Sequence, residues 1–257
     1  YSVSNPVLYY NADLLREAGL SEDGPTSWEE FVSFAKTVKD TTGKYGAYLQ
    51  EGDTWVLQAV LESGGASMLT RDGDTATASF ASDAGKAAMQ SYADMVLTDE
   101  SAVHLTNLED GLKAFNDGEV AMCVASIAKA TNVLESANFD VRATTFPAFE
   151  GHDRAVPAGG CYLAITAQDS EEQQAAWEFI KFLCSDDNAA KWVAGTGYVP
   201  ATKGAENSSI LTDYLEQNPL MQAAMDQRAD AVQWTPWVHW LREAEPPLAD
   251  MRDQILG

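Results

Sequence analysis

The sequence has 257 residues, of which 46% are hydrophobic and 10% aromatic, enough apolar material for one large domain or two smaller lobes. It carries 16 Lys and Arg against 39 Asp and Glu, a formal net charge of −23. Such a charge repels phosphates and anionic membranes, so it excludes a broad nucleic-acid-binding face. A solvated surface or a saline habitat would each produce this acidity.

In chain order, the first predicted elements are a buried strand at residues 7–10 (VLYY) and a helix that begins after Asn11 and ends at Gly19. Ser27 and Glu30 have the spacing of a capping box for the next helix. Further strands are predicted at residues 45–50 and 120–126, and further helices at residues 55–62, 82–97 and 108–115.

Residues 71–75 (RDGDT) predict a tight hairpin turn, because a calcium loop would need more ligands than Asp72 and Asp74. The stretch AGGCYLAITA at residues 158–167 predicts a glycine pair running into a strand. Ser170 and Gln173 predict a second capping box, and a last helix is predicted to end at Gly195. Strands that alternate with helices in this way indicate an α/β fold.

The three cysteines, Cys123, Cys161 and Cys184, form no CxxC or metal-ligand spacing, and we expect them to be small buried residues. No apolar run is long enough to span a bilayer. The chain opens on Tyr-Ser-Val-Ser-Asn-Pro, so a signal peptide, if one exists, is expected outside this sequence.

Enzyme motifs are missing from the sequence. Neither GxGxxG nor GxxxxGK[ST] occurs, and no GxSxG elbow is present. His104, His152 and His239 have no triad or metal spacing, so we expect surface or core histidines. Carboxylate pairs are too frequent in so acidic a chain to indicate a glycosidase. We therefore expect no catalytic residue, no cofactor and no metal.

The aromatic residues indicate ligand binding more clearly than any motif indicates catalysis. Trp234, Trp237 and Trp240 are three apart, and on a helix they would share one face. Such a stripe packs in a core, or it forms an aromatic wall against a sugar ring or glycerol chain.

Four stretches carry a family resemblance: SVSNPVLYYNADLLREAGL with TSWEEF after it, AFNDGEVAM, AGGCYLAIT and GTGYVPATK. In this order they resemble the extracellular solute-binding proteins of ABC importers, in the group of glycerol-3-phosphate-binding and maltose-binding proteins. The resemblance implies a type II periplasmic-binding-protein-like fold, with two α/β lobes that close on a solute. It also implies a fragment, in which residues 1–158 and 197–257 form the C-terminal lobe and residues 159–196 contribute to the N-terminal lobe.

The resemblance implies a set of ligand-binding residues. Hydroxyls of Ser4 and Ser126 would bond the solute, and Gly160 would let backbone approach it. Trp55 would stack beneath its apolar edge. The set is Ser4, Trp55, Ser126, Gly160, Tyr198 and Arg242.

Two positions in this set depend on local chain geometry. Tyr198 would offer a ring and a hydroxyl from a turn that Gly195 and Gly197 allow. Arg242 would grip a phosphate or a pair of hydroxyls. Pro246 and Pro247 predict a break in the helix that follows Arg242.

The function implied is non-enzymatic capture of a glycerol phosphate derivative, for delivery to an ABC membrane permease. A mono- or oligosaccharide-binding protein is the alternative, and a carbohydrate hydrolase is a third hypothesis. The protein is expected to be a bacterial, extracellular or periplasmic monomer, free or lipid-anchored, without a nucleic-acid partner.

Overall fold

The computed structural model describes residues 1–235 and 241–257, and only the backbone of residues 241–244. The strands are β1 (Ser2–Ser4), β2 (Pro6–Asn11), β3 (Tyr45–Leu49), β4 (Leu69–Asp72), β5 (Thr75–Ala78), β6 (Val120–Ser126), β7 (Val141–Thr145), β8 (Val156–Cys161) and β9 (Ala231–Gln233). The α-helices are α1 (Ala12–Glu17), α2 (Trp28–Thr42), α3 (Trp55–Ser63), α4 (Asp83–Leu97), α5 (Leu108–Asn116), α6 (Ala130–Ser136), α7 (Ser170–Leu183), α8 (Asp186–Thr196), α9 (Ser209–Gln217), α10 (Leu220–Asp226) and α11 (Leu241–Leu256). Short 3₁₀ turns lie at η1 (Ile127–Lys129), η2 (Ala205–Asn207) and η3 (Arg228–Asp230).

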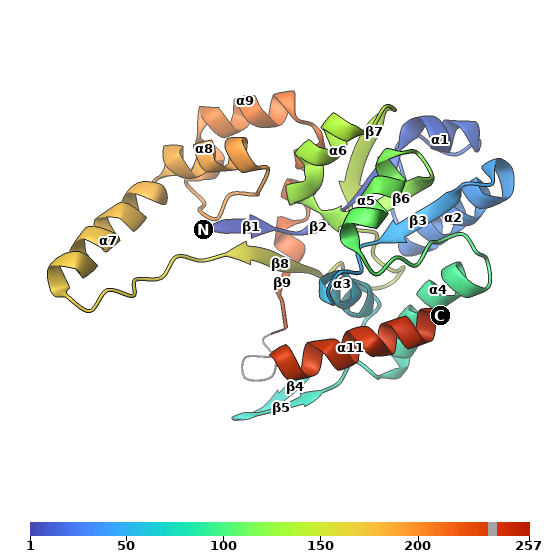
Figure 1. The fold of residues 1–257 in the computed structure, drawn as a ribbon, viewed down its shortest axis with the longest axis horizontal. Helices are drawn as coiled ribbons and strands as arrows, with labels where there is room; N and C mark the ends of the chain where they lie inside the picture. The colour runs from blue at the N-terminus through green and yellow to red at the C-terminus, as the bar shows by residue number, and fades with distance from the viewer. Residues whose placement is uncertain (236–240) are drawn as a thin grey trace.

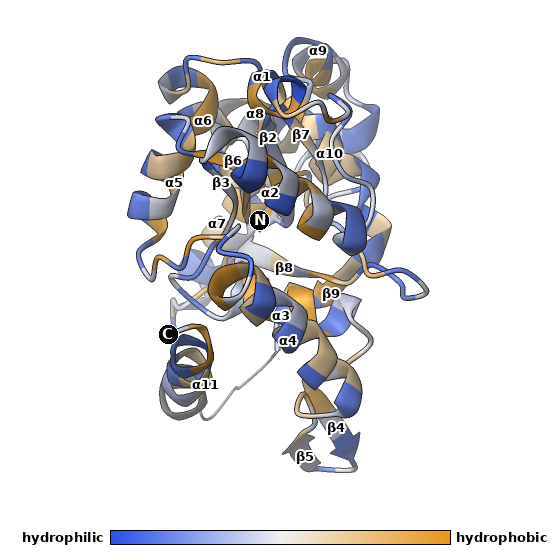
Figure 2. Cartoon of the chain, turned by 90° about the vertical axis from the view of Figure 1, so that its right-hand side faces the viewer, coloured by the Kyte–Doolittle hydropathy of each residue, from blue (hydrophilic) through white to orange (hydrophobic). Residues whose placement is uncertain are grey.

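The main sheet has the strand order β3-β6-β2-β7, with β3 and β6 parallel and the other pairs antiparallel. Successive residues of β2 enter different cores: Leu8 and Tyr10 pack into one hydrophobic cluster, Val7 and Tyr9 into the other. This two-residue period is what a strand buried on both faces requires. Figure 2 shows the helices around this sheet, with hydrophilic residues in blue and hydrophobic residues in orange. A sheet covered by helices confirms the predicted α/β fold.

Helix starts follow the predicted capping chemistry. Asn11 Oδ1 accepts a hydrogen bond from Leu14 N at 2.9 Å, and Ser27 Oγ accepts one from Glu30 N at 3.2 Å. The Glu30 carboxylate accepts hydrogen bonds from the backbone N–H and the hydroxyl of Thr26, the residue before the cap. The Oγ atom of Ser27 satisfies one N–H group of the first helical turn.

A second sheet, β1-β8-β9, crosses the middle of the molecule, where β1 and β8 run side by side (Figure 1). Strand β1 leads directly into β2 of the main sheet, so the two sheets share one continuous segment. On its other edge, β1 forms a bridge between Val3 and Val199. Residues far apart in sequence therefore meet at β1.

The segment after β8 differs from the prediction. Strand β8 includes the glycine pair but ends at Cys161, and residues 162–166 lie exposed outside any described strand. Helix α7, which projects away from the other elements (Figure 1), buries none of its residues. A strand needs a hydrogen-bonding partner, and none of the described residues supplies one here.

Two smaller predictions in this segment are also wrong. Asp169, not Ser170, caps α7, because its Oδ1 accepts from the N–H groups of Glu171 and Glu172. Cys161 is exposed and Cys184 is half-buried, because Cys161 lies at the end of β8 and Cys184 lies just after the exposed helix α7. Cys123 is buried in β6, as predicted.

Helix α11 continues through Pro246 and Pro247, so the predicted break does not occur. A proline φ near −65° suits a helix, and the cost is two missing backbone donors. Buried Leu248 and Leu256 hold α11 against the main core. Trp234 follows β9 and packs partly buried on that core, while Trp237, His239 and Trp240 lie outside the described residues.

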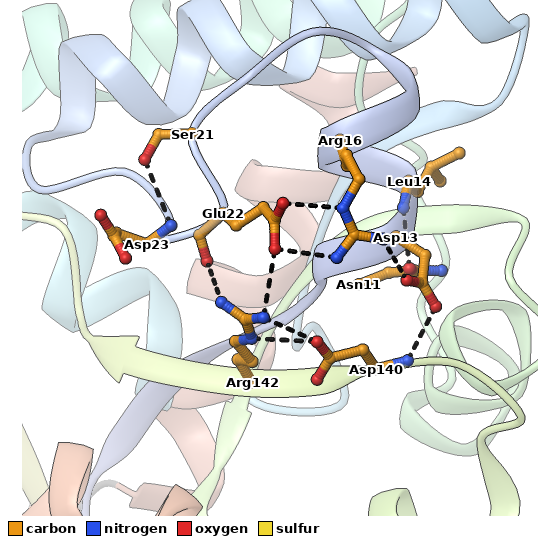
Figure 3. A network of polar contacts seen from close by, with 9 residues as sticks. All are labelled: Asn11, Asp13, Leu14, Arg16, Ser21, Glu22, Asp23, Asp140 and Arg142. Carbon is orange, nitrogen blue, oxygen red and sulfur yellow. Dashed lines mark hydrogen bonds and ion pairs between the residues drawn. The ribbon is translucent and has the colours of Figure 1, made fainter.

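An ion-pair network joins α1 to β7 (Figure 3). Arg142 bonds Asp140 at 2.7 Å and Glu22 at 3.2 Å, and Arg16 bonds Glu22 at 2.7 Å and Asp13 at 2.8 Å. The backbone N–H of Asp140, followed by Arg16, holds the pKa of Asp13 below the ordinary value of a carboxyl group, and Arg16 with Arg142 lowers the pKa of Glu22. None of the helices in the described part of the chain has the length and apolar character needed to cross a membrane.

Candidate functional site

Three predicted site residues, Ser4, Trp55 and Gly160, lie at the β1–β8 ladder. Ser4 is opposite Gly159 in this ladder and is 5% exposed. A Cβ atom at Gly159 would lie 2.8 Å from Ser4 Oγ and 3.2 Å from Trp55 Cζ2. Glycine therefore leaves just enough room for the serine hydroxyl and the indole edge to lie together.

Gly160, the glycine singled out by the sequence, is opposite Val3 and exposed. Its φ is +128°, and a Cβ there would lie 1.9 Å from the carbonyl oxygen of Ser2. The backbone of β1 thus requires glycine at this position. Gly159, which the sequence analysis missed, is the glycine that contacts Trp55.

Tyr198 lies in the chain segment that bonds β1. Val199 N donates to Val3 O at 2.8 Å, and Tyr198, the residue before Val199, is half-buried. The turn before it differs from the prediction: Gly195 lies inside α8, and only Gly197 adopts a left-handed conformation, with φ of +75°. The helix continues one residue past Gly195 and is capped by Gly197 N donating to Val193 O.

Ser126 ends β6 and lies next to the β1–β2 junction, because Ile127 N donates to Asn5 O at 3.1 Å. Its Oγ accepts from Ala128 N at 3.3 Å and caps the 3₁₀ turn η1. The turn η1 runs directly into α6, so Ser126 lies at the start of a helical segment whose first three residues form a 3₁₀ turn.

Trp55 is the first residue of α3, where Asp53 Oδ1 accepts from its backbone N–H at 2.9 Å. The side chain belongs to the main hydrophobic cluster and is 4% exposed. Its buried indole N–H has no hydrogen-bond partner among the described residues. An unpaired buried donor is costly, so this N–H is suited to an acceptor on a bound molecule.

Arg242 lies in α11, but its side chain is outside the described residues. A described cation lies near Ser4 instead: Arg228 and Ser4 both line a hollow of about 230 Å³, together with Val199 and Pro200. Arg228 pairs with Glu206 at 2.6 Å and holds the pKa of that carboxyl below its ordinary value. A larger hollow of about 470 Å³ lies between α2 and α4, and none of the predicted site residues whose side chains the structure describes lines it.

Sequence reasoning missed the loop that joins β3 to α3. Gln50 Oε1 accepts from Ser126 N at 3.3 Å, so this loop contacts both Ser126 and Trp55. Its position was readable in principle, because β3 and β6 are parallel and their carboxyl ends meet at one edge of the sheet. Burial raises the pKa of Asp53 in this loop.

A family model for bacterial extracellular solute-binding proteins matches residues 1–223. The chain belongs to this family. The glycerol-3-phosphate-binding periplasmic protein UgpB of Escherichia coli K12 is 26% identical over an alignment of 237 positions that covers 88% of this chain and 54% of that protein. The protein of the same name from Pectobacterium atrosepticum is 26% identical over 85% of this chain.

Solved structures of solute-binding proteins share this fold. UgpB from Mycobacterium tuberculosis in complex with glycerophosphocholine superposes with a TM-score of 0.83 at 26% identity, over all of this chain and 64% of that one. A cyclic α-maltosyl-1,6-maltose binding protein from Arthrobacter globiformis superposes with a TM-score of 0.87 at 23% identity, over 99% of this chain and 65% of that one. This similarity confirms the predicted type II binding-protein fold. The chain spans about half the length of the curated relatives it matches.

Proposed function

We propose that the chain is part of the solute-binding component of an ABC importer, which captures glycerol-3-phosphate or a glycerophosphodiester between two lobes. The observation that carries this proposal is the meeting of Ser4, Gly159 and Trp55, with Tyr198 and Ser126 beside them, at the junction of the two sheets. These residues come from distant segments, and they supply hydroxyls, an indole donor and open space, as sites for small polar solutes do.

Each residue has a proposed role. Ser4 and Ser126 donate or accept through their hydroxyls, Tyr198 offers its ring and phenol, and the buried N–H of Trp55 bonds a solute oxygen. Gly159 and Gly160 let solute and backbone approach. Arg242 remains a proposed phosphate ligand, and Arg228 adds a cation at the hollow beside Ser4.

A sugar is the second candidate solute. Ser4, Ser126, Trp55 and Tyr198 are all uncharged, and hydroxyls beside aromatic rings suit a mono- or oligosaccharide. A cyclic α-maltosyl-1,6-maltose binding protein and the maltose-bound T. maritima MalE3 share the fold of this chain, which supports keeping this alternative.

We also propose the lobe boundaries that the resemblance implies: residues 1–158 and 197–257 in one lobe, and residues 159–196 in the other. The supporting observation is that α7 leaves its aromatic residues exposed: Trp177 is 49%, Phe179 61% and Phe182 60% exposed. An apolar face of this kind is unusual on a finished surface, and a second lobe would cover it.

The proposal includes a membrane permease as partner and a monomeric protein outside the cell membrane, free or lipid-anchored. It does not include catalysis. None of the residues proposed to contact the solute is an aspartate or a glutamate. A carbohydrate hydrolase would instead need a pair of carboxylates at the bond that it cleaves.

A thermal-shift and calorimetric screen of the full-length gene product tests the proposal. The panel is glycerol-3-phosphate, glycerophosphocholine, maltose, trehalose and simple hexoses. A solute at about 100 times its Kd should stabilise the fold by about 2.7 kcal/mol. A phosphate solute should lose this effect in Arg242→Ala, whereas a sugar response should survive that change and fail in Tyr198→Ala. A protein that none of these solutes stabilises would contradict the proposal.

A further inference from the structure

Glu51 is a buried carboxylate in the loop between β3 and α3, and it is 2% exposed. It accepts hydrogen bonds from three groups: the hydroxyl of Tyr92 in α4, His104 Nδ1 at 2.6 Å and Leu105 N at 3.0 Å. Burial raises the pKa of Glu51, and the bonds from Tyr92 and His104 oppose this rise. Two segments distant in sequence therefore hold one carboxylate.

The loop that Glu51 holds is the one that contacts the candidate site. On one side of Glu51, Gln50 accepts from Ser126 N at 3.3 Å. On the other side, Asp53 Oδ1 accepts from Trp55 N at 2.9 Å. A displacement of the loop would therefore move both a hydroxyl and an indole of the site.

The same loop holds helix α11. Asp53 O accepts from Arg252 Nη1 at 2.8 Å, and Thr54 Oγ1 donates to Glu245 at 3.3 Å. His104 adds a third link, since its Nε2 lies 4.0 Å from Asp253 Oδ1. Loop, site and helix thus form one connected set of contacts.

Several charged or titratable groups face Glu51 and His104. Arg252 pairs with Asp253 at 2.7 Å, and the Tyr48 hydroxyl bonds Leu105 O at 3.4 Å. The groups that face the pair are Tyr48, Asp53, Tyr92, Glu245, Arg252 and Asp253. The imidazole, which is 17% exposed, lies between the carboxylates of Glu51 and Asp253.

We propose that Glu51 and His104 are positioning residues that hold the loop 50–54 and α11 in the geometry that binds solute. The inference rests on the proposed function only for its effect on affinity. Glu51 accepts hydrogen bonds from Tyr92, His104 and Leu105, and the loop that contains it bonds both the candidate site and α11.

Hydrogen exchange of the full-length gene product without solute tests the positioning role. The variants are Glu51→Gln and His104→Gln, and the matched control is His152→Gln, an exposed histidine outside the cluster. Amides at residues 50–57 should exchange about 10-fold faster in both variants and at the wild-type rate in the control. Unchanged protection in His104→Gln, a partly exposed position that tolerates substitution, would overturn the proposal.

The affinity for glycerophosphocholine tests the effect of this geometry on binding. We expect the Kd to be about 5-fold weaker in Glu51→Gln and in His104→Gln than in wild type, and unchanged in His152→Gln, because the loop bonds the backbone of both Ser126 and Trp55. A wild-type Kd in both cluster variants would overturn the effect on affinity. If glycerophosphocholine does not bind wild type, the proposed solute fails, and hydrogen exchange still decides the positioning role.

Discussion

Ser4 and Gly159 face each other across the β1–β8 ladder, and a Cβ at Gly159 would lie 2.8 Å from Ser4 Oγ. The next residue, Gly160, is required for a different reason, because its Cβ would meet the backbone carbonyl of Ser2. Gly159 therefore faces side chains of the candidate site, whereas Gly160 faces the backbone of β1.

This difference predicts distinct effects of two alanine substitutions. In Gly159→Ala the new methyl group displaces the end of a rotatable side chain and presses on Trp55, so we expect a stability loss of about 1 kcal/mol and about 10-fold weaker solute binding. In Gly160→Ala the methyl group meets backbone at a φ of +128°, so we expect a loss of about 3 kcal/mol or more. Urea denaturation measures the stability loss of each variant, and equal losses would contradict the different surroundings of the two glycines.

The two glycines before Tyr198 should also respond in opposite directions. Gly195 lies in α8 with open space around it, so Gly195→Ala should stabilise the protein by about 0.5–1 kcal/mol. Gly197 has a φ of +75°, so Gly197→Ala should destabilise it by about 1 kcal/mol. Thermal unfolding of the two variants side by side tests the helix end, and a stabilising Gly197→Ala would be inconsistent with it.

Glu51 should shape the dependence of stability on pH. Because folding raises the pKa of Glu51 above its ordinary 4.5, its contribution to stability is fully present below that value and declines as pH rises through the folded value. Glu51→Gln removes this ionisation, so the free energy of unfolding should fall less than in wild type as pH rises from about 4 to about 7. Asp53, whose pKa is also raised, stays in both proteins. Parallel curves from urea titrations across this range would contradict the prediction.

The network in Figure 3 should give salt-sensitive stability. Arg142 bonds Glu22 and Asp140 at a partly exposed position, so Arg142→Gln should lower the melting temperature slightly in dilute buffer. At about 1 M NaCl the difference from wild type should shrink, since exposed charges are screened within about 3 Å. The pKa of Glu22 is lowered, so its contribution is lost as pH falls through the folded value. A difference that grows with salt would rule out an electrostatic role.

The exposed aromatic residues of α7 test the lobe boundaries. If a second lobe covers this face, Phe182→Ser in the full-length gene product should cost about 3 kcal/mol. Gln173→Ser, nearly opposite Phe182 on the helix, is the control and should cost less than about 0.5 kcal/mol. Equal melting temperatures for the two variants would mean that α7 stays exposed.

The elements that the sequence predicted well are those whose signals are local. Asn11 and Ser27 cap their helices with side chains three residues from the donors, and the apolar run at β6 is buried along its length. These interactions depend on neighbouring residues, so a sequence pattern records them.

The predictions that failed depend on distant contacts. The residues around Gly159 in the sequence do not indicate that Ser4 and Trp55, which are 155 and 104 residues away, will lie against it in the folded chain. Residues 162–166 have the composition of a strand, yet they pair with none of the described residues. Glu51 and His104, 53 residues apart, likewise meet only in the folded chain.

The measurement that tests the site most directly is the Kd of Trp55→Phe in the full-length gene product, for whichever solute of the panel stabilises wild type most. Phenylalanine keeps a ring in the core and removes only the unpaired buried N–H and part of the indole. We expect the Kd to rise about 10-fold, equivalent to about 1.4 kcal/mol, with little change in the melting temperature of the free protein. An unchanged Kd would show that Trp55 does not bond the solute and would contradict a site built on Ser4, Gly159 and Trp55.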